Sequence, residues 1–235
     1  MPSLHYLPKP LPDGKQWTWQ PREAAYVRIY HKDFFTPSAT HRRAYGPLAR
    51  FDHHTPPFTS PDTCPDGRSI TYVAETIRAA ASEVFGDADP FGVCPQWRLA
   101  WLKTTASVVV QDIVGPAAMA LKTRPALGSS PEVTREFSQQ CARDIYAGHP
   151  HVAGIRYTGS HEEGRCLALW ERAPDLKIVE DATTPCDYKI VDDEMWAEIL
   201  MAYASTTYTL ERINVSECDY CREAAEAEGT SVARK

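Results

Sequence analysis

The sequence predicts an α+β domain, in which strands and helices are mixed without the regular alternation of a parallel βαβ sheet. Short segments rich in β-branched and aromatic residues recur along the chain, and longer segments show the hydrophobic spacing of helices. Two of the connections between these segments are long and rich in proline. A doubly wound parallel sheet would need a more regular order of elements.

Each predicted strand carries the β-branched or aromatic residues that strands favour. These strands cover residues 24–31, 69–73, 97–104, 106–113, 152–158 and 165–171. Gly159 and Gly164 bracket the turn between the last two strands, which predicts a hairpin there.

Three segments have the spacing of helices, and they cover residues 74–86, 131–147 and 192–204. Pro131 is placed to open the second helix, and Gly148-His149-Pro150 to close it. The third helix is amphipathic, with its apolar face formed by Met195, Trp196, Ile199, Leu200 and Tyr203. The segment from Glu217 onward is polar and rich in alanine, and we expect it to fray.

These elements predict three parts: a Pro-rich arm at 1–20, one domain at 21–175 and a C-terminal helical extension at 176–235. The connection at 36–68 has no predicted helix or strand. A loop of this length within a compact domain is often functional.

The charge balance excludes some classes of function. The chain has 25 Lys and Arg residues against 31 Asp and Glu residues, a net charge of −6. This argues against a general nucleic-acid-binding protein, although a few arginines can still form a local anion site. The N-terminal residues lack an apolar leader and no segment has the length of a membrane span, so we expect a cytoplasmic protein.

The seven cysteines are expected to be reduced, because their number is odd and no secretion signal precedes them. Cys218 and Cys221 form a C-x-x-C pair, whereas structural zinc usually takes two such pairs, and Cys186 lies far upstream. On a helix the pair would simply share a face. The sequence therefore predicts no metal site. The adjacent His53 and His54 are interpreted as loop histidines.

Several nucleotide and hydrolase motifs are missing from the sequence. It has no G-x-x-x-x-G-K-[ST], no G-x-G-x-x-G, no G-x-S-x-G and no H-E-x-x-H. An enzyme that acts on a nucleotide would here have to hold the phosphates with side chains.

Glu83 has an unusual position on the first predicted helix. The expected apolar face is formed by Val73, Ile77, Ala80 and Val84. The opposite face, formed by Glu75, Arg78 and Ser82, is expected to meet water. Glu83 lies at the edge of the apolar face. Periodicity alone favours a boundary glutamate that reaches solvent or pairs with a nearby arginine.

Arg28 lies within the first predicted strand. Alternation places it with Tyr26 and Tyr30 on one face, and Val27 and Ile29 on the other. The residue could line a nucleotide pocket, but the pattern alone favours an exposed strand face.

These positions recur together in a known pattern, and the sequence resembles the RES-domain family between about Tyr26 and Trp170. The stretches that carry the resemblance are 26–30 (YVRIY), 49–52 (ARFD), 70–76 (ITYVAET), 80–84 (AASEV), 107–113 (SVVVQDI), 137–142 (FSQQCA), 154–160 (GIRYTGS) and 164–170 (GRCLALW). Their order and spacing make the sum more specific than any single stretch. The resemblance implies a single domain with an ADP-ribosyltransferase-like fold.

The family is named after an arginine, a glutamate and a serine. The resemblance implies Arg28 or Arg50 as the arginine and Glu83 as the glutamate. Ser138 ranks first for the serine and Ser160 second. The implied roles are a catalytic set of Glu83, Arg28 and Ser138, and ligand contacts from Arg28, Arg50, Tyr72, Ser138 and Ser160.

The resemblance implies an enzyme that cleaves the nicotinamide–ribose bond of NAD, by phosphorolysis or hydrolysis. NAD would be a substrate rather than a cofactor, and inorganic phosphate a second substrate. The resemblance also implies a toxin with an Xre-like antitoxin partner. Two alternatives stay open: a mono-ADP-ribosyltransferase acting on a protein, and a non-catalytic NAD-binding or interaction module. The helix around Trp196 could form a homodimer surface or cover the pocket.

Overall fold

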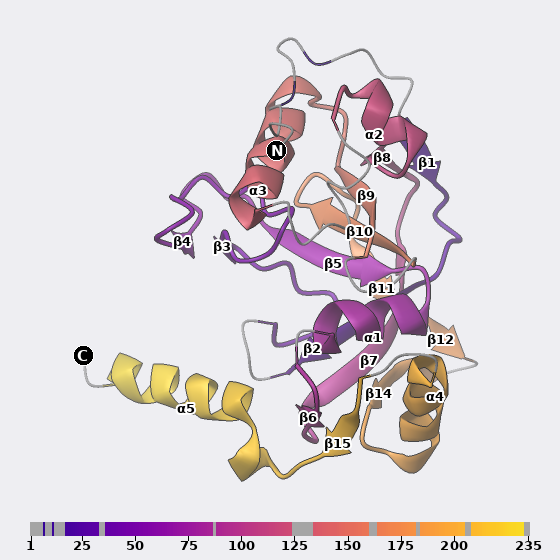
Figure 1. The fold of residues 1–235 in the computed structure, drawn as a ribbon, viewed down its shortest axis with the longest axis vertical. Helices are drawn as coiled ribbons and strands as arrows, with labels where there is room; N and C mark the ends of the chain where they lie inside the picture. The colour runs from indigo at the N-terminus through magenta and orange to yellow at the C-terminus, as the bar shows by residue number, and fades with distance from the viewer. Residues whose placement is uncertain are drawn as a thin grey trace.

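A mixed β-sheet forms the centre of the fold in the computed structural model (Figure 1). The structure describes residues 7, 11, 17–32, 36–86, 88–123, 134–159, 164–181, 184–204 and 208–232. In these residues the sheet has nine strands in the order β1-β8-β9-β10-β5-β2-β7-β11, and β14 also pairs with β7. The strands are β1 (Trp17–Gln20), β2 (Tyr26–His31), β5 (Ile70–Ala74), β7 (Trp97–Thr104), β8 (Val108–Asp112), β9 (Gly154–Thr158), β10 (Arg165–Trp170), β11 (Leu176–Ile178) and β14 (Asp187–Lys189). Only the β8–β9 pair is parallel among these described strands.

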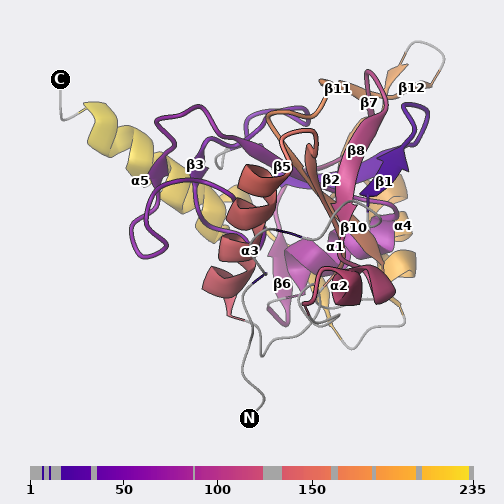
Figure 2. The ribbon, with the colours of Figure 1, turned by 90° about the horizontal axis from the view of Figure 1, so that it is seen from above.

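Helices cover the sheet at both ends (Figures 1 and 2). The helices are α1 (Ile77–Phe85), α2 (Pro116–Ala120), α3 (Arg135–Gly148), α4 (Asp193–Tyr203), α5 (Asp219–Val232) and the 3₁₀ turn η2 (Val215–Glu217). In Figure 1, α2 and α3 lie toward the end of the sheet that carries β1, β8 and β9, and α1 and α4 lie toward the end that carries β2 and β7. The predicted α+β class is confirmed, because a mostly antiparallel sheet is combined with separate helices.

Among the described residues, three further pairs of short strands lie outside the central sheet. They are β3 (Tyr45–Gly46) with β4 (Asp62–Thr63), β12 (Glu180–Asp181) with β13 (Thr184–Pro185), and β6 (Phe91–Val93) with β15 (Leu210–Arg212). The connection at 36–68 contains only β3 and β4, so its irregular character is confirmed. The segment expected as an N-terminal arm contributes β1, and the expected C-terminal extension contributes β11 and β14.

The predicted strands and hairpin are confirmed, with small shifts at their ends. β9 and β10 pair antiparallel as expected. The first helix begins at Ile77 rather than at 74, because Ala74 still belongs to β5 and the Thr76 side chain caps the helix through the Ala79 N–H. The next long helix begins after Thr134, whose side chain caps it at Phe137. Pro131, which was expected to open that helix, lies outside the described residues.

One face of α1 differs from the prediction. Ala80 is buried as expected, but Ser82, which was expected to meet water, is only 2% exposed. Helix α1 packs against the sheet and also against α4. Because the sheet and α4 both contact α1, more of the helix surface is buried than its single predicted apolar face indicates.

Arg28 is also more buried than its pattern indicates. All six residues of β2 are buried, and Arg28 is 5% exposed, so the exposed-face interpretation is wrong. The alternation itself is confirmed: Val27 and Ile29 belong to one apolar cluster, and Tyr26 and Tyr30 to another. The face with Arg28 is buried because the chain around Ala39 folds back over it, as the hydrogen bonds below show.

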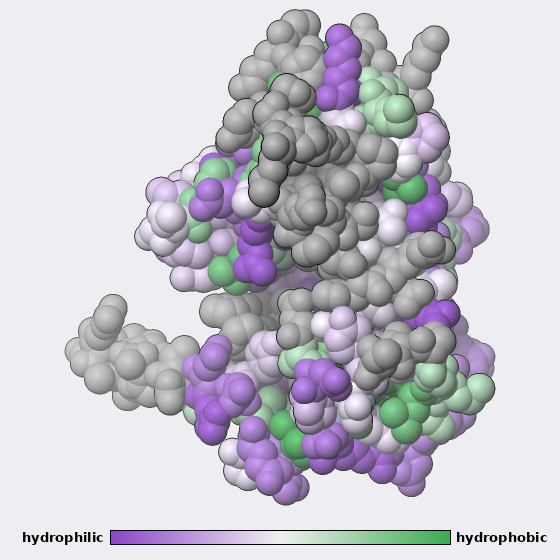
Figure 3. Space-filling model, in the orientation of Figure 1, coloured by the Kyte–Doolittle hydropathy of each residue, from purple (hydrophilic) through white to green (hydrophobic). Residues whose placement is uncertain are grey.

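The C-terminal residues are part of the packed structure as far as the first turn of α5. On α4, Met195, Ile199 and Tyr203 are buried, whereas Leu200 and Met201 are exposed. The space-filling view shows an apolar area over α4 (Figure 3). The segment from Glu217, expected to fray, leads through the buried Cys218 into α5. Helix α5 extends away from the body of the molecule in both ribbon views. None of the described helices is long and apolar enough to cross a membrane.

Candidate functional site

Two adjoining cavities lie between β2, β5 and α1. The larger has a volume of about 230 Å³ and the smaller about 50 Å³. Arg28 and Tyr72 line both cavities, and Glu83 lines the smaller one. The larger cavity extends toward Arg43 and Leu48, at the start of the loop that carries Arg50. The sequence-predicted residues of the strands and of α1 therefore lie around one cleft.

Glu83 forms an ion pair with Arg50 at this cleft. The Arg50 Nη2 atom donates to both carboxylate oxygens of Glu83, at 2.9 and 3.2 Å, and each side chain is 19% exposed. The Tyr157 hydroxyl donates to Glu83 Oε2 at 3.3 Å. The edge position predicted for Glu83 and its expected pairing with an arginine are both confirmed. The pair places the Arg50 guanidinium against the Glu83 carboxylate, which lines the smaller cavity.

Aromatic rings surround the Arg50 guanidinium. It lies 5.2 Å from the ring centre of Tyr157 and 5.7 Å from that of Phe51, and these two rings pack 4.6 Å apart. Burial, followed by the nearby Glu83 carboxylate, raises the pKa of Tyr157 well above its ordinary value. The Tyr157 hydroxyl therefore stays protonated and acts as a donor toward Glu83.

Asp52 holds the loop that carries Arg50, although the sequence analysis gave it no role. Its carboxylate accepts a 2.6 Å bond from Arg43, a 2.6 Å bond from the Leu48 N–H and a 2.7 Å bond from the Tyr72 hydroxyl. Burial raises the pKa of Asp52, but the charge of Arg43 and the Leu48 bond outweigh it and hold this pKa below its usual value. The only sequence signal was its place in the run that follows Arg50.

Tyr72 lines the cleft with its ring and faces the loop with its hydroxyl. Besides donating to Asp52, the hydroxyl accepts a bond from the Phe51 N–H at 3.2 Å. Burial and the Asp52 charge raise the pKa of Tyr72 well above its ordinary value. The phenol is therefore neutral, and it fixes β5 to the residue that follows Arg50.

Arg28 is fixed by backbone carbonyl groups of the irregular connection. Its Nη1 atom donates to the carbonyl oxygens of Ala39 and His41, at 2.6 and 2.7 Å. Burial lowers the pKa of Arg28 to about 10, so the side chain remains charged at neutral pH. A buried guanidinium held by neutral carbonyl groups keeps a net positive charge near the cavities, which favours an anionic ligand.

The two candidate serines have different positions. Ser138 lies on α3, is fully buried, lines neither cavity, and its hydroxyl has no hydrogen-bond partner among the described residues. Its neighbour Gln139 donates to the Ala49 carbonyl at 2.9 Å, which links α3 to the loop before Arg50. Ser160 lies outside the described residues.

A second polar cluster surrounds the predicted loop histidines. Both His53 and His54 lie in the irregular connection, but neither is exposed. His53 Nε2 lies 2.9 Å from Glu171 Oε2, and the Tyr146 hydroxyl donates to Glu171 Oε1 at 2.7 Å. These residues connect the loop, α3 and the end of β10. Because the partners are far apart in sequence, spacing gave no signal for this cluster.

Comparison with known proteins gives one family and one solved structure. The family model of the RES domain matches residues 19–189, a range that includes Arg28, Arg50, Tyr72, Glu83 and Ser138. No curated protein matches the chain. The structure is similar to a chain in the crystal structure of the M. tuberculosis MbcT–MbcA toxin–antitoxin complex, with 14% identity and a TM-score of 0.45, covering 74% of this chain and 87% of that one.

Proposed function

The chain belongs to the RES-domain family, and we propose that its cleft binds NAD and that the enzyme breaks the bond between nicotinamide and ribose. The observation that carries the proposal is the Glu83–Arg50 pair, which lies beside cavities lined by Arg28 and Tyr72. A carboxylate, two guanidinium groups and an aromatic ring are the groups that this substrate and reaction require.

Glu83 would stabilise the transition state of bond cleavage. When the C1′–N bond breaks, both electrons leave with the nicotinamide, whose ring loses its positive charge, and the ribose becomes oxocarbenium-like. A carboxylate beside that carbon lowers the energy of the developing cation, as in glycoside hydrolysis. The half-buried position of Glu83 strengthens this effect because the local dielectric is lower than in water.

The two arginines would hold the negatively charged pyrophosphate. Guanidinium groups suit phosphate oxygens, and this chain has no glycine-rich phosphate loop. Arg28 is buried and fixed by two carbonyl groups, so its charge is already in place before the ligand binds. The Tyr72 ring offers an apolar surface for nicotinamide. A serine would contact a ribose hydroxyl or the phosphate that attacks, and because Ser138 is buried and lines neither cavity, Ser160 is the candidate for this contact.

The reaction is completed by an acceptor that forms a new bond to C1′. Inorganic phosphate would give ADP-ribose 1″-phosphate and water would give ADP-ribose. Purified protein incubated with NAD, with and without phosphate, would distinguish these products by ¹H and ³¹P NMR. We expect release of nicotinamide in at least one condition.

Glu83→Gln tests the role of the carboxylate. We expect a loss of about 100-fold or more in turnover, the usual effect of removing one charge-stabilising contact from a transition state. Glu75→Gln is a matched control, because Glu75 also pairs with an arginine, Arg156, at 2.9 Å, but lines neither cavity. Circular dichroism and melting temperature would verify that both variants fold.

The outcomes separate the possible functions. Wild-type turnover in Glu83→Gln would overturn the assigned role of this residue. Binding of NAD without release of nicotinamide would indicate a non-catalytic module, and transfer of ADP-ribose to added protein would indicate a transferase. The family resemblance also supports a toxin with an antitoxin partner, so expression of wild type should deplete cellular NAD and arrest growth, whereas Glu83→Gln should not.

A further inference from the structure

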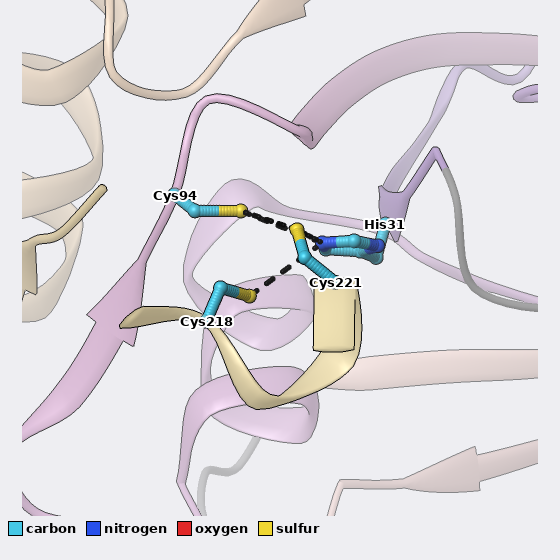
Figure 4. Close-up of side chains that lie close together, drawn as sticks. All are labelled: His31, Cys94, Cys218 and Cys221. Atoms are coloured by element: carbon cyan, nitrogen blue, oxygen red, sulfur yellow. Dashed lines mark hydrogen bonds between the residues drawn. The ribbon is translucent and has the colours of Figure 1, made fainter. Parts of the chain in front are cut away.

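Four metal-binding side chains from distant parts of the sequence meet at the end of β2. His31 ends β2, Cys94 follows β6, Cys218 lies between η2 and α5, and Cys221 belongs to the first turn of α5. Figure 4 shows the three sulfur atoms and the His31 imidazole directed at one another. All four ligand atoms lie within 4.8 Å of one another.

The distances between these atoms match a tetrahedral zinc site. Zn–S bonds of about 2.3 Å and Zn–N bonds of about 2.0–2.1 Å place two sulfurs about 3.8 Å apart, and a sulfur and a nitrogen about 3.6 Å apart. The Sγ atoms of Cys94 and Cys221 are 3.6 Å apart. His31 Nε2 lies 3.4, 3.7 and 3.4 Å from the sulfurs of Cys94, Cys218 and Cys221.

The surroundings of the cluster suit a structural ion. Cys94, Cys218 and His31 are 0%, 1% and 2% exposed. The rings of Trp97 and Tyr220 lie 5.1 and 5.7 Å from the His31 ring, so aromatic side chains shield the imidazole. Thiolate and imidazole ligands favour Zn²⁺ over the hard cations Mg²⁺ and Ca²⁺.

We propose that His31, Cys94, Cys218 and Cys221 bind one structural Zn²⁺ ion. All four positions of the tetrahedron are filled by protein ligands, which is typical of structural rather than catalytic zinc. The sequence pattern alone predicts no metal site, because it contains only one C-x-x-C pair. The other two ligands, His31 and Cys94, lie far before that pair in sequence and are brought to it only by folding.

The ion would fasten the C-terminal segment to the domain. Two of its ligands lie beyond residue 189, where the family match ends, and two lie within the match. His31 is three residues after Arg28 on β2 and, with Trp97, lines the larger cavity. Zinc binding would therefore hold the end of the strand that presents Arg28 to the cleft.

A disulfide is the competing use of these thiols, and the geometry disfavours it. A disulfide needs its two sulfurs about 2.0 Å apart. The Cys94 and Cys221 sulfurs are 3.6 Å apart, and all seven cysteines are free. The imidazole in contact with all three sulfurs has no role in a disulfide but supplies the fourth ligand of a metal.

The first experiment measures metal in the intact wild-type chain. Elemental analysis of protein purified without chelator should give about one zinc per chain. Replacement by Co²⁺ should give the visible absorption of a tetrahedral site and a thiolate-to-metal charge-transfer band. Removal of the ion by a chelator should lower the melting temperature, and added Zn²⁺ should restore it.

Cys221→Ser removes one ligand at the least buried position and should lose the zinc and the cobalt spectrum. Cys64→Ser is the matched control, because Cys64 is also buried but donates to Asp66, and a serine hydroxyl can keep that bond. We expect the control to retain full metal content. Wild-type protein that binds neither Zn²⁺ nor Co²⁺, or that contains a Cys94–Cys221 disulfide by mass spectrometry, would overturn the proposal. So would unchanged zinc in Cys221→Ser.

Discussion

Glu171 shows how much one carboxylate contributes to the irregular part of this fold. It accepts hydrogen bonds from the Tyr146 hydroxyl and from the Ser69 N–H, and His53 Nε2 lies 2.9 Å away. Burial raises the pKa of Glu171, but the bonds from His53 and Tyr146 lower it more, to about 2. The ionised form is therefore specifically stabilised in the folded protein.

This pKa predicts a defined dependence of stability on pH. A carboxyl whose pKa falls from 4.5 to about 2 on folding stabilises the protein above pH 4.5, and this contribution is lost as the pH falls toward 2. Because the side chain is 26% exposed, we expect Glu171→Gln to lower the free energy of unfolding at pH 7 by about 2–3 kcal/mol.

Urea titrations of wild type and Glu171→Gln at several pH values would measure this effect. The difference between the two proteins should shrink below pH 4.5 and nearly vanish at pH 2. Glu198→Gln, at an exposed position on α4, is the control variant. A difference that stays constant across this range would mean that the ionised carboxylate is not the source of the stability.

Single residues also show where sequence reasoning succeeds. The position of Glu83 at the edge of a helix face followed from periodicity, and its arginine partner was expected. The burial of Arg28 did not follow, because strand alternation defines which residues share a face but not what covers that face. Here the backbone of Ala39 and His41 covers the face, and its two carbonyl oxygens accept hydrogen bonds from the Arg28 guanidinium.

At the scale of elements, the approach of the β9–β10 hairpin to α1 determines where Glu83 lies. A side chain at Gly164 would place its Cβ only 2.3 Å from the Cβ of Ala79 and 3.2 Å from its Cα. Ala79 is one helical turn before Glu83, so both residues lie on the same side of α1. The absence of a side chain at Gly164 therefore allows the helix to lie close to the hairpin.

We predict that Gly164→Ala shifts α1 and impairs both stability and catalysis. Overpacking of this kind costs about 1–3 kcal/mol, and it would move Glu83 relative to Arg50. Adding Ala79→Gly removes the Cβ that the new methyl group meets. The double variant should recover much of the NAD turnover, although glycine within a helix costs about 1 kcal/mol.

Wild type, Gly164→Ala, Ala79→Gly and the double variant form a double-mutant cycle, in which thermal unfolding and NAD cleavage are measured for each protein. Additive losses in the double variant would contradict the proposed contact. Recovery of activity without full recovery of stability would agree with it. Activity reports the position of α1, whereas stability also reports the lower helix propensity of glycine at position 79.

The elements themselves were predicted well where local pattern determines them. Strands β2, β5, β7 and β10 formed close to their expected ends, and α3 ends close to its expected end, whereas its predicted start lies outside the described residues. The start of α1 was predicted three residues early, since the apolar residues at the end of β5 continue the helical spacing by coincidence. The loop around Asp52 could not be predicted in any detail, because side-chain bonds rather than a repeating backbone pattern determine its shape.

At the scale of the whole molecule, the residues beyond the family match complete the domain. Helix α4 packs against α1, and β15 pairs with β6. Ile213, just after β15, packs over Gly92. These contacts join residues about 100 or more positions apart, which is why the sequence alone indicated only an appended helical extension.

This packing predicts the effect of removing the C-terminal residues. A chain ending at residue 190 would lose the buried side chains of Met195, Ile199, Tyr203 and Leu210. Each such side chain contributes about 1.5–3 kcal/mol, and together they approach the 5–15 kcal/mol that holds a whole domain folded. We expect this chain to be unfolded or aggregated, without NAD turnover.

A chain ending at residue 222 keeps these side chains and all four zinc ligands, and it should match full-length protein in melting temperature. If the shorter chain folds with full-length stability, the C-terminal residues are an independent appendage rather than part of the domain.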